Sequence, residues 1–242
     1  MCRQTAQNRA MPFGRILDRD RNNLLMTAPV ADPRLAGPRL RALYPLLPQF
    51  AGWTSQRQAE FLTARALVMR GMRIFGQTPR PVLPAPEAPP DWGEGITGSI
   101  SYAAGQVGVW LSRSVDRGPG LNLLPITGGP DMLTAAEIRL LDHLPGLARM
   151  AGRERLAAAV SAKRALVKAL AVCGRGRFSP GCAEVVLSDL PGVTLSLTHD
   201  LGVGLWRGTR FRVGLRVLPG LVMTQVSVPC RPGLAAVPCH WH

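Results

Sequence analysis

Residues 160–170 read Val-Ser-Ala-Lys-Arg-Ala-Leu-Val-Lys-Ala-Leu, and this stretch holds the most unusual feature of the chain. The chain has 29 Lys and Arg residues, yet Lys163 and Lys168 are its only lysines. The apolar spacing predicts a helix over residues 153–173, on which Arg164 and Lys168 share a face and Lys163 lies about 100° away. The three cations form either a solvated basic face or an anion-binding site. The scarcity of lysine favours the anion-binding site, because it suggests that a compact ammonium is needed at both positions.

The composition is that of a folded protein. Hydrophobic residues make up 46% of the 242 residues and charged residues 18%, which argues against general disorder. The sequence has no apolar run long enough for a membrane span, and its polar start does not resemble a secretory signal. Five cysteines without a CxxC pair predict reduced thiols in a cytoplasmic protein. A net charge of +14 favours anionic partners, whereas 5% aromatic residues argue against base-stacking platforms for nucleic acid.

On both sides of this helix, the periodicity predicts further helices and strands, which together form an α+β protein made of two halves of similar content. The predicted elements are, in order, a helix over residues 55–76, a hairpin of strands 95–102 and 107–113 around the turn 103–106, a strand over 121–126, a helix opening with a capping box at 134–137, the long helix, and a meander of four strands between 184 and 217. The predicted organisation is a flexible extension at 1–27, an N-terminal half at 28–117, a C-terminal half at 118–219 and a tail at 220–242.

Several other residues are candidates for chemistry. Ser99 and Ser101 point to the same side of a predicted strand and suit phosphate binding, although many strands carry solvent-facing serines. His143 and His199 have no partner at metal-ligand spacing, and His199 is better explained as part of a turn than as a general base. The Cys/His-rich end of the tail lacks the ordered spacing of a zinc site. No P-loop, GxGxxG or GxSxG motif is present.

Four blocks, taken in order, resemble the phosphopantetheinyl transferases of the surfactin-synthetase and enterobactin-synthetase type. The similarity covers about residues 50–217. Each block by itself matches the family pattern only weakly, and the specificity comes from finding all four in order. The blocks are Arg57 followed by Glu60-Phe61-Leu62-Thr63-Ala64-Arg65, similar to R-x-x-E-F-L-x-G-R; residues 88–102, ending in Gly98-Ser99-Ile100-Ser101-Tyr102, similar to G-S-I-S-H; residues 120–126, similar to G-V-D-I-E-P-I; and residues 160–170, similar to F-S-A-K-E-A-x-x-K-A-L.

The resemblance implies a fold and a reaction. The fold is two similar α+β halves related by pseudo-twofold symmetry, with coenzyme A in the cleft between them. In the reaction, a serine of an acyl or peptidyl carrier protein attacks the β-phosphate of coenzyme A, phosphopantetheine is transferred and 3′,5′-ADP leaves. Cations neutralise the charge on the pyrophosphate. The resemblance also implies coenzyme A contacts from six positions, and a monomer, because both halves lie on one chain. The six positions are Arg57, Arg65, Ser101, Tyr102, Lys163 and Lys168.

The departures from the family pattern fall on the metal site. Family members hold Mg²⁺ with the Asp and Glu of D-x-E and the Glu of K-E, which is also a proposed base. These positions are Asn122, Leu124 and Arg164 here, and the nucleotide-contacting histidine is Tyr102. Leucine offers Mg²⁺ no oxygen and arginine repels it, so we expect no metal site of the family type.

Three interpretations follow from the sequence. In a working transferase, Arg164 would replace the charge of the metal by gripping the pyrophosphate beside Lys163, and Asp116 would be the nearest spare carboxylate in sequence. In a pseudoenzyme, coenzyme A or carrier-protein binding would remain without turnover. In a basic nucleic-acid-binding protein, the net charge would be the functional feature.

Overall fold

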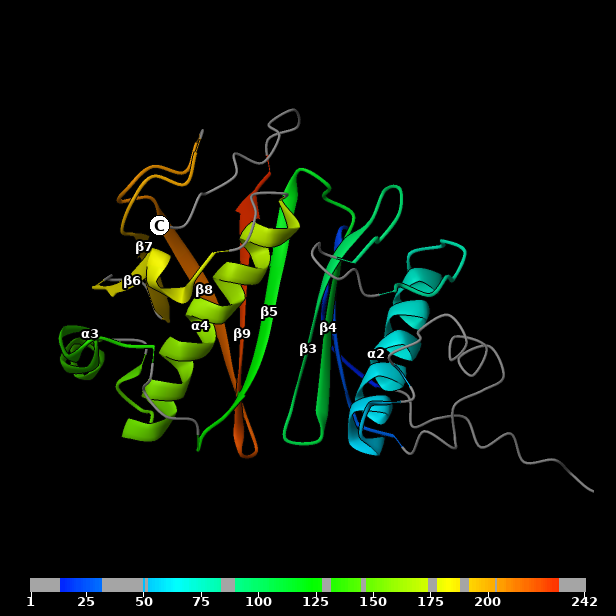
Figure 1. Ribbon diagram of the computed structural model, residues 1–242, viewed down its shortest axis with the longest axis horizontal. Coiled ribbons are helices and arrows are strands. Elements are labelled where there is room, and N and C mark those ends of the chain that lie inside the picture. The colour runs from blue at the N-terminus through cyan, green and yellow to red at the C-terminus, as the bar shows by residue number, and fades with distance from the viewer. Residues whose placement is uncertain are drawn as a thin grey trace, which may run out of the picture.

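The computed structural model describes residues 14–31, 50, 52–83, 90–127, 132–144, 147–173, 178–187, 192–202 and 204–230. Figure 1 shows two antiparallel sheets, each covered by one long helix, so the predicted α+β class is confirmed. The pseudo-twofold relation between the halves stays a prediction.

The N-terminal half is a four-stranded sheet in the order β1-β2-β4-β3, packed against the helix α2 (Ser55–Ile74). The strands are β1 (Arg15–Arg19), β2 (Asn23–Pro29), β3 (Thr97–Ala103) and β4 (Gln106–Ser112). Thr54 caps the start of α2, and Gly76 follows its end in the left-handed region, as its position predicts. The predicted hairpin is confirmed, because β3 and β4 pair around a two-residue turn at Ala104 and Gly105, both with positive φ.

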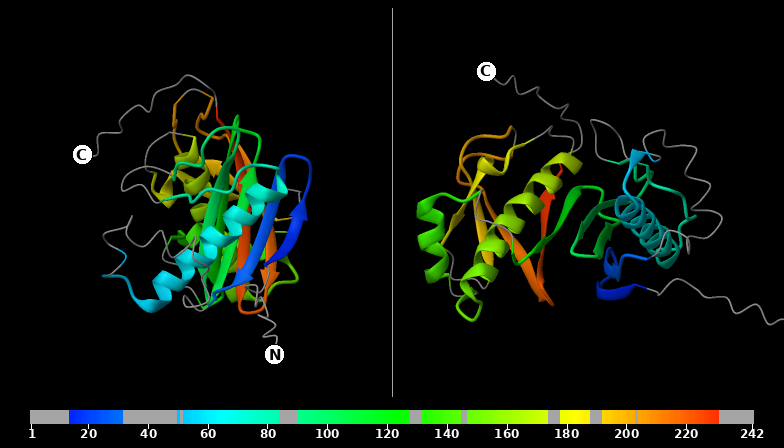
Figure 2. Two further views of the ribbon diagram at one scale, coloured as in Figure 1. Left: turned by 90° about the vertical axis from the view of Figure 1, so that its right-hand side faces the viewer. Right: turned by 60° about the horizontal axis from the view of Figure 1, so that its bottom comes forward.

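The C-terminal half is a five-stranded sheet in the order β5-β9-β8-β7-β6, covered by the helix α4 (Gly152–Val172) (Figure 2). The strands are β5 (Arg117–Pro125), β6 (Ala183–Val186), β7 (Val193–Leu197), β8 (Arg210–Leu218) and β9 (Leu221–Pro229). The short helix α3 (Ala135–Leu140) opens with the predicted capping box, in which Thr134 and Glu137 bond each other's backbone N–H groups. Short 3-10 turns, η4 (Leu141–His143) and η6 (Pro180–Cys182), complete this half.

The prediction that both ends of the chain lie outside the folded halves is wrong where the structure describes them. The expected extension at 1–27 contains β1 and most of β2, and the expected tail at 220–242 begins with β9. β9 lies between β5 and β8 and is buried on both faces. Val222 faces α4, whereas Met223 packs toward the N-terminal half. A strand buried on both faces lacks the apolar-polar alternation that marks a half-exposed strand. The Cys/His-rich end of the tail lies outside the described residues.

Two further predictions are corrected. A strand is expected over residues 203–208, but the described residues 204–208 form turns instead, because Gly204 and Gly208 adopt positive φ angles that interrupt extended backbone. The thiols of Cys173 and Cys230 are joined in a disulfide rather than reduced. The folding of β9 back beside α4 brings them together, and their separation of 57 residues gives no local signal for this pairing. No described helix is long and apolar enough to cross a membrane.

The close packing of α4 on β5 depends on glycine. A Cβ at Gly120 would lie 2.0 Å from the carbonyl oxygen of Ala165, and one at Gly118 would lie 2.4 Å from that of Ala169. Because both neighbours are helix backbone, neither can move aside without displacing α4. The two glycines therefore set the distance at which α4 lies on the sheet.

Gly120→Ala should lower the free energy of unfolding by about 3 kcal/mol, the upper range for overpacking a close contact. Gly152→Ala is the matched control, because nothing lies within 4 Å of the Cβ that it adds. Urea unfolding followed by circular dichroism measures both variants. Equal stability of the two would show that α4 is free to shift on β5.

Candidate ligand-binding site

The two sheets meet along β3 and β5, where serine hydroxyls of β3, rather than backbone carbonyls, accept hydrogen bonds from the backbone of β5. Ser99 Oγ accepts from the backbone N–H of Leu121 at 3.0 Å, and Ser101 Oγ accepts from that of Leu123 at 3.0 Å. Both serines are buried, so these bonds satisfy amides that would otherwise lie unpaired at a covered strand edge. Ser99 and Ser101, which the sequence offers as candidate phosphate ligands, therefore bridge the two halves.

Lys168 completes this bridge from α4. Its ammonium donates to Ile100 O at 3.2 Å, Ser101 Oγ at 3.1 Å and Leu121 O at 3.0 Å, so its three protons meet acceptors on both β3 and β5. None of the three acceptors carries a formal charge. Burial, assisted by the nearby charge of Arg164, lowers the pKa of Lys168 from 10.5 to about 8.

Asn122, the first position of the family's D-x-E, lies in a neutral buried network. Its amide donates to Ser161 Oγ at 3.0 Å, and Ser161 Oγ lies 2.7 Å from Thr224 Oγ1. Its side-chain oxygen lies 3.5 Å from Ser101 Oγ. Hydroxyls and an amide therefore fill the space around the position where the resemblance places a metal-binding carboxylate.

The other two metal positions do not suit Mg²⁺ either. Leu124 is buried among Ala157, Val160 and Val222, and Arg164 carries a positive charge. Among the described residues, no group of three or more His, Cys, Asp or Glu side chains could hold a metal ion. Mg²⁺ needs hard oxygen ligands, usually with at least one carboxylate, so the residues present do not fit the metal of the family.

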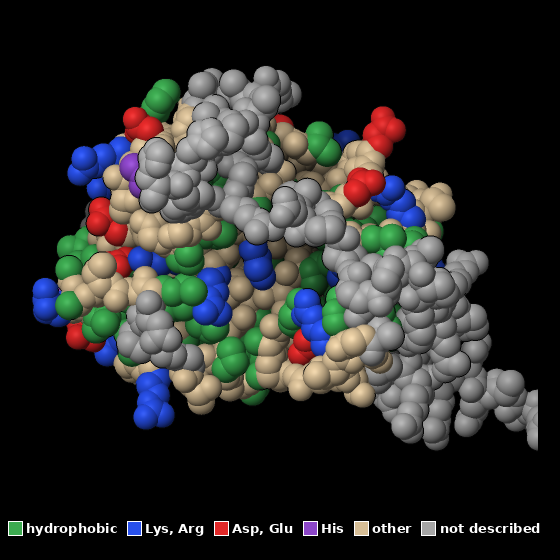
Figure 3. All heavy atoms as spheres, viewed as in Figure 1, with side chains coloured by type: hydrophobic (Ala, Val, Ile, Leu, Met, Phe, Trp, Pro, Cys, Tyr) green, Lys and Arg blue, Asp and Glu red, His purple; other side chains and the backbone are tan. Residues whose placement is uncertain are grey.

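A second cationic group lies across β3, on α2. The guanidinium of Arg57 lies 4.3 Å from the ring centre of Tyr102 and pairs with Glu60 at 3.7 Å. Arg65 stacks on Phe61 at 4.1 Å, and its burial lowers its pKa to about 10, with Arg57 acting in the same direction. Tyr102 follows Ser101 along β3, so neighbouring residues of one strand contact Arg57 on α2 and Lys168 on α4. Figure 3 shows blue side chains on both sides of the surface between the halves.

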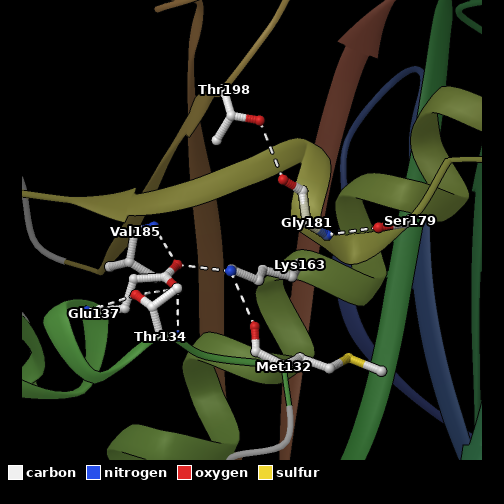
Figure 4. Close-up of polar contacts among 8 residues, drawn as sticks. All are labelled: Met132, Thr134, Glu137, Lys163, Ser179, Gly181, Val185 and Thr198. Carbon is white, nitrogen blue, oxygen red and sulfur yellow. Dashed lines mark hydrogen bonds and ion pairs between the residues drawn. The ribbon is translucent and has the colours of Figure 1, made fainter.

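Lys163, in contrast, lies on another side of α4 and is paired within the C-terminal half (Figure 4). Its ammonium lies 2.7 Å from Glu137 Oε1 and donates to Met132 O at 3.1 Å. Glu137 also accepts from the backbone N–H groups of Thr134 and Val185. Burial opposes ionisation of Glu137, but these hydrogen bonds outweigh it and hold its pKa below the usual value. One carboxylate thus joins α3, α4 and β6.

A pocket of about 470 Å³ lies beside this ion pair. Its lining includes Leu133, Pro180 and Ala183, the hydroxyls of Ser179 and Thr198, the paired Glu137 and Lys163, and the carboxylate of Glu184. Apolar walls with hydroxyls and an additional carboxylate suit an uncharged chain better than a diphosphate. The pocket and the Arg57–Lys168 region therefore differ in chemistry.

Asp116 does not reach the metal positions. It is exposed in the loop before β5, and its carbonyl accepts from the N–H of Cys230 at the far end of β9. Asn122 lies six residues further along an extended strand, about 20 Å away at the usual rise. The carboxylate that is nearest in sequence is therefore not placed to act as a base there.

Sequence reasoning missed three residues that organise this region: Glu137, Ser161 and Thr224. The sequence predicts Glu137 only as part of a helix cap and Ser161 only as part of a motif, and it places Thr224 in the tail. Their partners are 26 to 63 residues away, as the pairs Glu137–Lys163 and Ser161–Thr224 show. Local periodicity contains no signal for such pairings.

Because Lys168 has a lowered pKa, the folded chain binds fewer protons at this site than the unfolded chain between pH 8 and 10.5. Stability should therefore rise with pH across this window relative to a Lys168→Met variant. In Arg164→Gln the rise should be smaller and begin at higher pH, because the repelling charge is gone. Chemical unfolding at half-unit pH steps measures the difference, and parallel curves for wild type and Lys168→Met would contradict it.

Glu137→Gln should lower the free energy of unfolding by about 3 kcal/mol, because it leaves the charge of Lys163 buried without its counter-charge. Glu137→Gln combined with Lys163→Met should cost less than the sum of the two single changes. Glu154→Gln is the control, since Glu154 forms a capping box at an exposed helix start. In wild type the contribution of Glu137 is complete above pH 4.5 and is lost as the pH falls through its lowered pKa. Additive costs would show that the pair is not coupled.

Among curated protein sequences, none matches this chain. One similar solved structure is the holo-[acyl-carrier-protein] synthase of Thermotoga maritima, with 23% identity and a TM-score of 0.35. The match covers 47% of this chain and 64% of the synthase, so the chain spans less than two thirds of that protein. Residues 49–111 match the family model described as the 4'-phosphopantetheinyl transferase N-terminal domain. This match covers less than half of the chain and confirms the resemblance found in the sequence: residues 49–111 are similar to the N-terminal domain of phosphopantetheinyl transferases.

Proposed function

We propose that this chain is a phosphopantetheinyl transferase-like protein that binds coenzyme A with protein cations and does not catalyse the Mg²⁺-dependent transfer of its family. The observation that carries the proposal is the neutral network of Asn122, Ser161 and Thr224, beside the buried Leu124. A metal-dependent transferase needs carboxylates at these positions, and the buried network leaves no charge for a divalent ion to bind.

Support for anion binding comes from the cations around β3. Arg57 is partly exposed beside Tyr102, and Arg164 raises the local potential enough to help lower the pKa of Lys168. Among the described residues, no carboxylate or carbonyl pairs with the Arg164 guanidinium. A diphosphate there would receive charge-assisted hydrogen bonds from a planar donor fork. Lys168 itself is fully engaged, so its role in this proposal is to hold β3 and β5 in place rather than to grip the ligand.

Because Arg164 has no acceptor partner among the residues that the structure describes, it also favours one second function, which is transfer without a metal. In that case Arg164 would neutralise the pyrophosphate directly, and a carrier-protein serine would attack it with no Mg²⁺ present. Nucleic-acid binding has only the net charge in its favour.

Calorimetric titration of coenzyme A into the protein, with EDTA or with Mg²⁺, tests the proposal. We expect the same affinity in both buffers and a loss of about tenfold or more in Arg164→Ala, the usual effect of removing a charge-assisted contact. Arg153→Ala is the matched control, because it removes an exposed arginine from the first turn of the same helix. Binding that requires Mg²⁺, or that is unchanged in Arg164→Ala, would contradict the proposal.

A transfer assay separates the binding protein from the enzyme. An apo acyl carrier protein is incubated with coenzyme A and the chain, with EDTA or Mg²⁺, and its mass is measured. We expect no mass increase in either buffer. An increase in EDTA would establish the metal-free transferase, and one that depends on Mg²⁺ would overturn the reading of the site. Steeply salt-dependent binding of duplex DNA without coenzyme A binding would favour the nucleic-acid alternative.

A further inference from the structure

The disulfide between Cys173 and Cys230 fastens the end of α4 to the end of β9. Cys173 follows the last residue of α4, and its N–H bonds the carbonyls of Ala169 and Leu170. Cys230 follows β9, and its N–H bonds the carbonyl of Asp116. The bond therefore ties one helix end to two chain segments that are distant in sequence.

The disulfide also packs directly on β5. A Cβ at Gly118 would lie 2.6 Å from Cys173 Sγ and 3.2 Å from Cys230 Sγ. α4 lies close to β5 at Gly118 and Gly120. The disulfide adds a covalent link to this packing at the C-terminal end of the helix. Lys168 lies five residues before Cys173, about 7.5 Å along the helix axis. The covalent link is therefore about one and a half turns from the ammonium that bridges β3 and β5.

The described cysteines differ in access to solvent. Cys173 and Cys230 are partly exposed, whereas Cys182 is 3% exposed within the core of the C-terminal half. Burial raises the pKa of the Cys182 thiol to about 11, so it has little thiolate at neutral pH. A small thiol or disulfide in solution can thus reach the Cys173–Cys230 pair without opening the core.

We propose that Cys173–Cys230 is a reversible redox clamp that opens and closes in the folded protein and sets how firmly the end of α4 is held on β5 and β9. The oxidant is a low-molecular-weight disulfide such as oxidised glutathione. A thiolate of one cysteine attacks a sulfur of that disulfide, forms a mixed disulfide and releases one small thiol. The thiolate of the other cysteine then displaces the second small thiol. Two protein thiols are oxidised and one small disulfide is reduced to two thiols.

Opening the clamp should loosen the last turn of α4. The N–H groups there bond carbonyls at a helix end, where hydrogen bonds fray readily once a covalent restraint is removed. The link joins residues 57 positions apart, so it restricts the unfolded chain strongly and its loss should lower the melting temperature by roughly 10 °C. The clamp stands independently of the proposed coenzyme A binding, because it concerns how α4 is anchored rather than what it binds.

The test is titration of the full chain with mixtures of reduced and oxidised glutathione under native conditions, followed by alkylation and peptide mapping. We expect a peptide linking Cys173 to Cys230 that disappears and returns as the ratio is reversed. The melting temperature should follow the linked fraction, and amide exchange should rise at the end of α4 in the reduced protein. Cys173→Ser with Cys230→Ser should melt like reduced wild type and ignore the glutathione ratio.

Cys239→Ser is the control for the remaining cysteine near the chain end, and it should respond as wild type does. Absence of a Cys173–Cys230 peptide at every glutathione ratio would overturn the proposal. A bond that opens only in denaturant would overturn it too, because the link would then be a fixed structural disulfide. Reduction without any change in melting temperature or amide exchange would show that the link does not hold α4.

Discussion

Two sheet edges meet without pairing their backbones, and the structure depends on how that boundary is closed. β3 and β5 each end one sheet, and an uncovered edge would leave N–H and C=O groups unsatisfied. Ser99 and Ser101 accept the N–H groups of β5, and Lys168 donates to carbonyls on both strands. α4 can supply that lysine because Gly118 and Gly120 let it lie close to β5. The packing of one helix thus determines how two halves of the chain are joined.

The same closure decides what chemistry the region supports. An ammonium that meets three uncharged acceptors is held by hydrogen bonds alone, and burial together with the nearby charge of Arg164 lowers the pKa of Lys168. A carboxylate at position 122 would supply a counter-charge, but the amide of Asn122 instead joins a chain of hydroxyls through Ser161. Within the part of the chain that the structure describes, the site therefore combines excess positive charge with no cluster of metal-binding side chains. This balance favours an anionic ligand and disfavours a divalent cation.

The sequence predicted the elements with strong local signals. The helices at 55–76 and 153–173, the hairpin turn at Ala104 and Gly105, and the capping box at Thr134 all depend on residues close in sequence, and the structure has them. β9 was missed because a strand buried on both faces shows no alternation. The partners of Lys163 and the disulfide were missed because both join distant segments. The motif located the important positions, but what each side chain contacts depends on the assembled fold.

The two lysines can now be explained by their partners rather than by a shared ligand. Lys168 donates three hydrogen bonds to β3 and β5, and Lys163 places a buried ammonium between Glu137 and a backbone carbonyl. A guanidinium is larger and planar, so it could form neither arrangement without displacing the groups that surround it. All the remaining Lys-or-Arg positions of the chain are arginine, so lysine is kept at the two places where only a compact cation fits. Their presence in the family motif therefore does not by itself indicate catalysis. Arg164, which lies between them and has no partner among the described residues, is the cation left to meet a ligand.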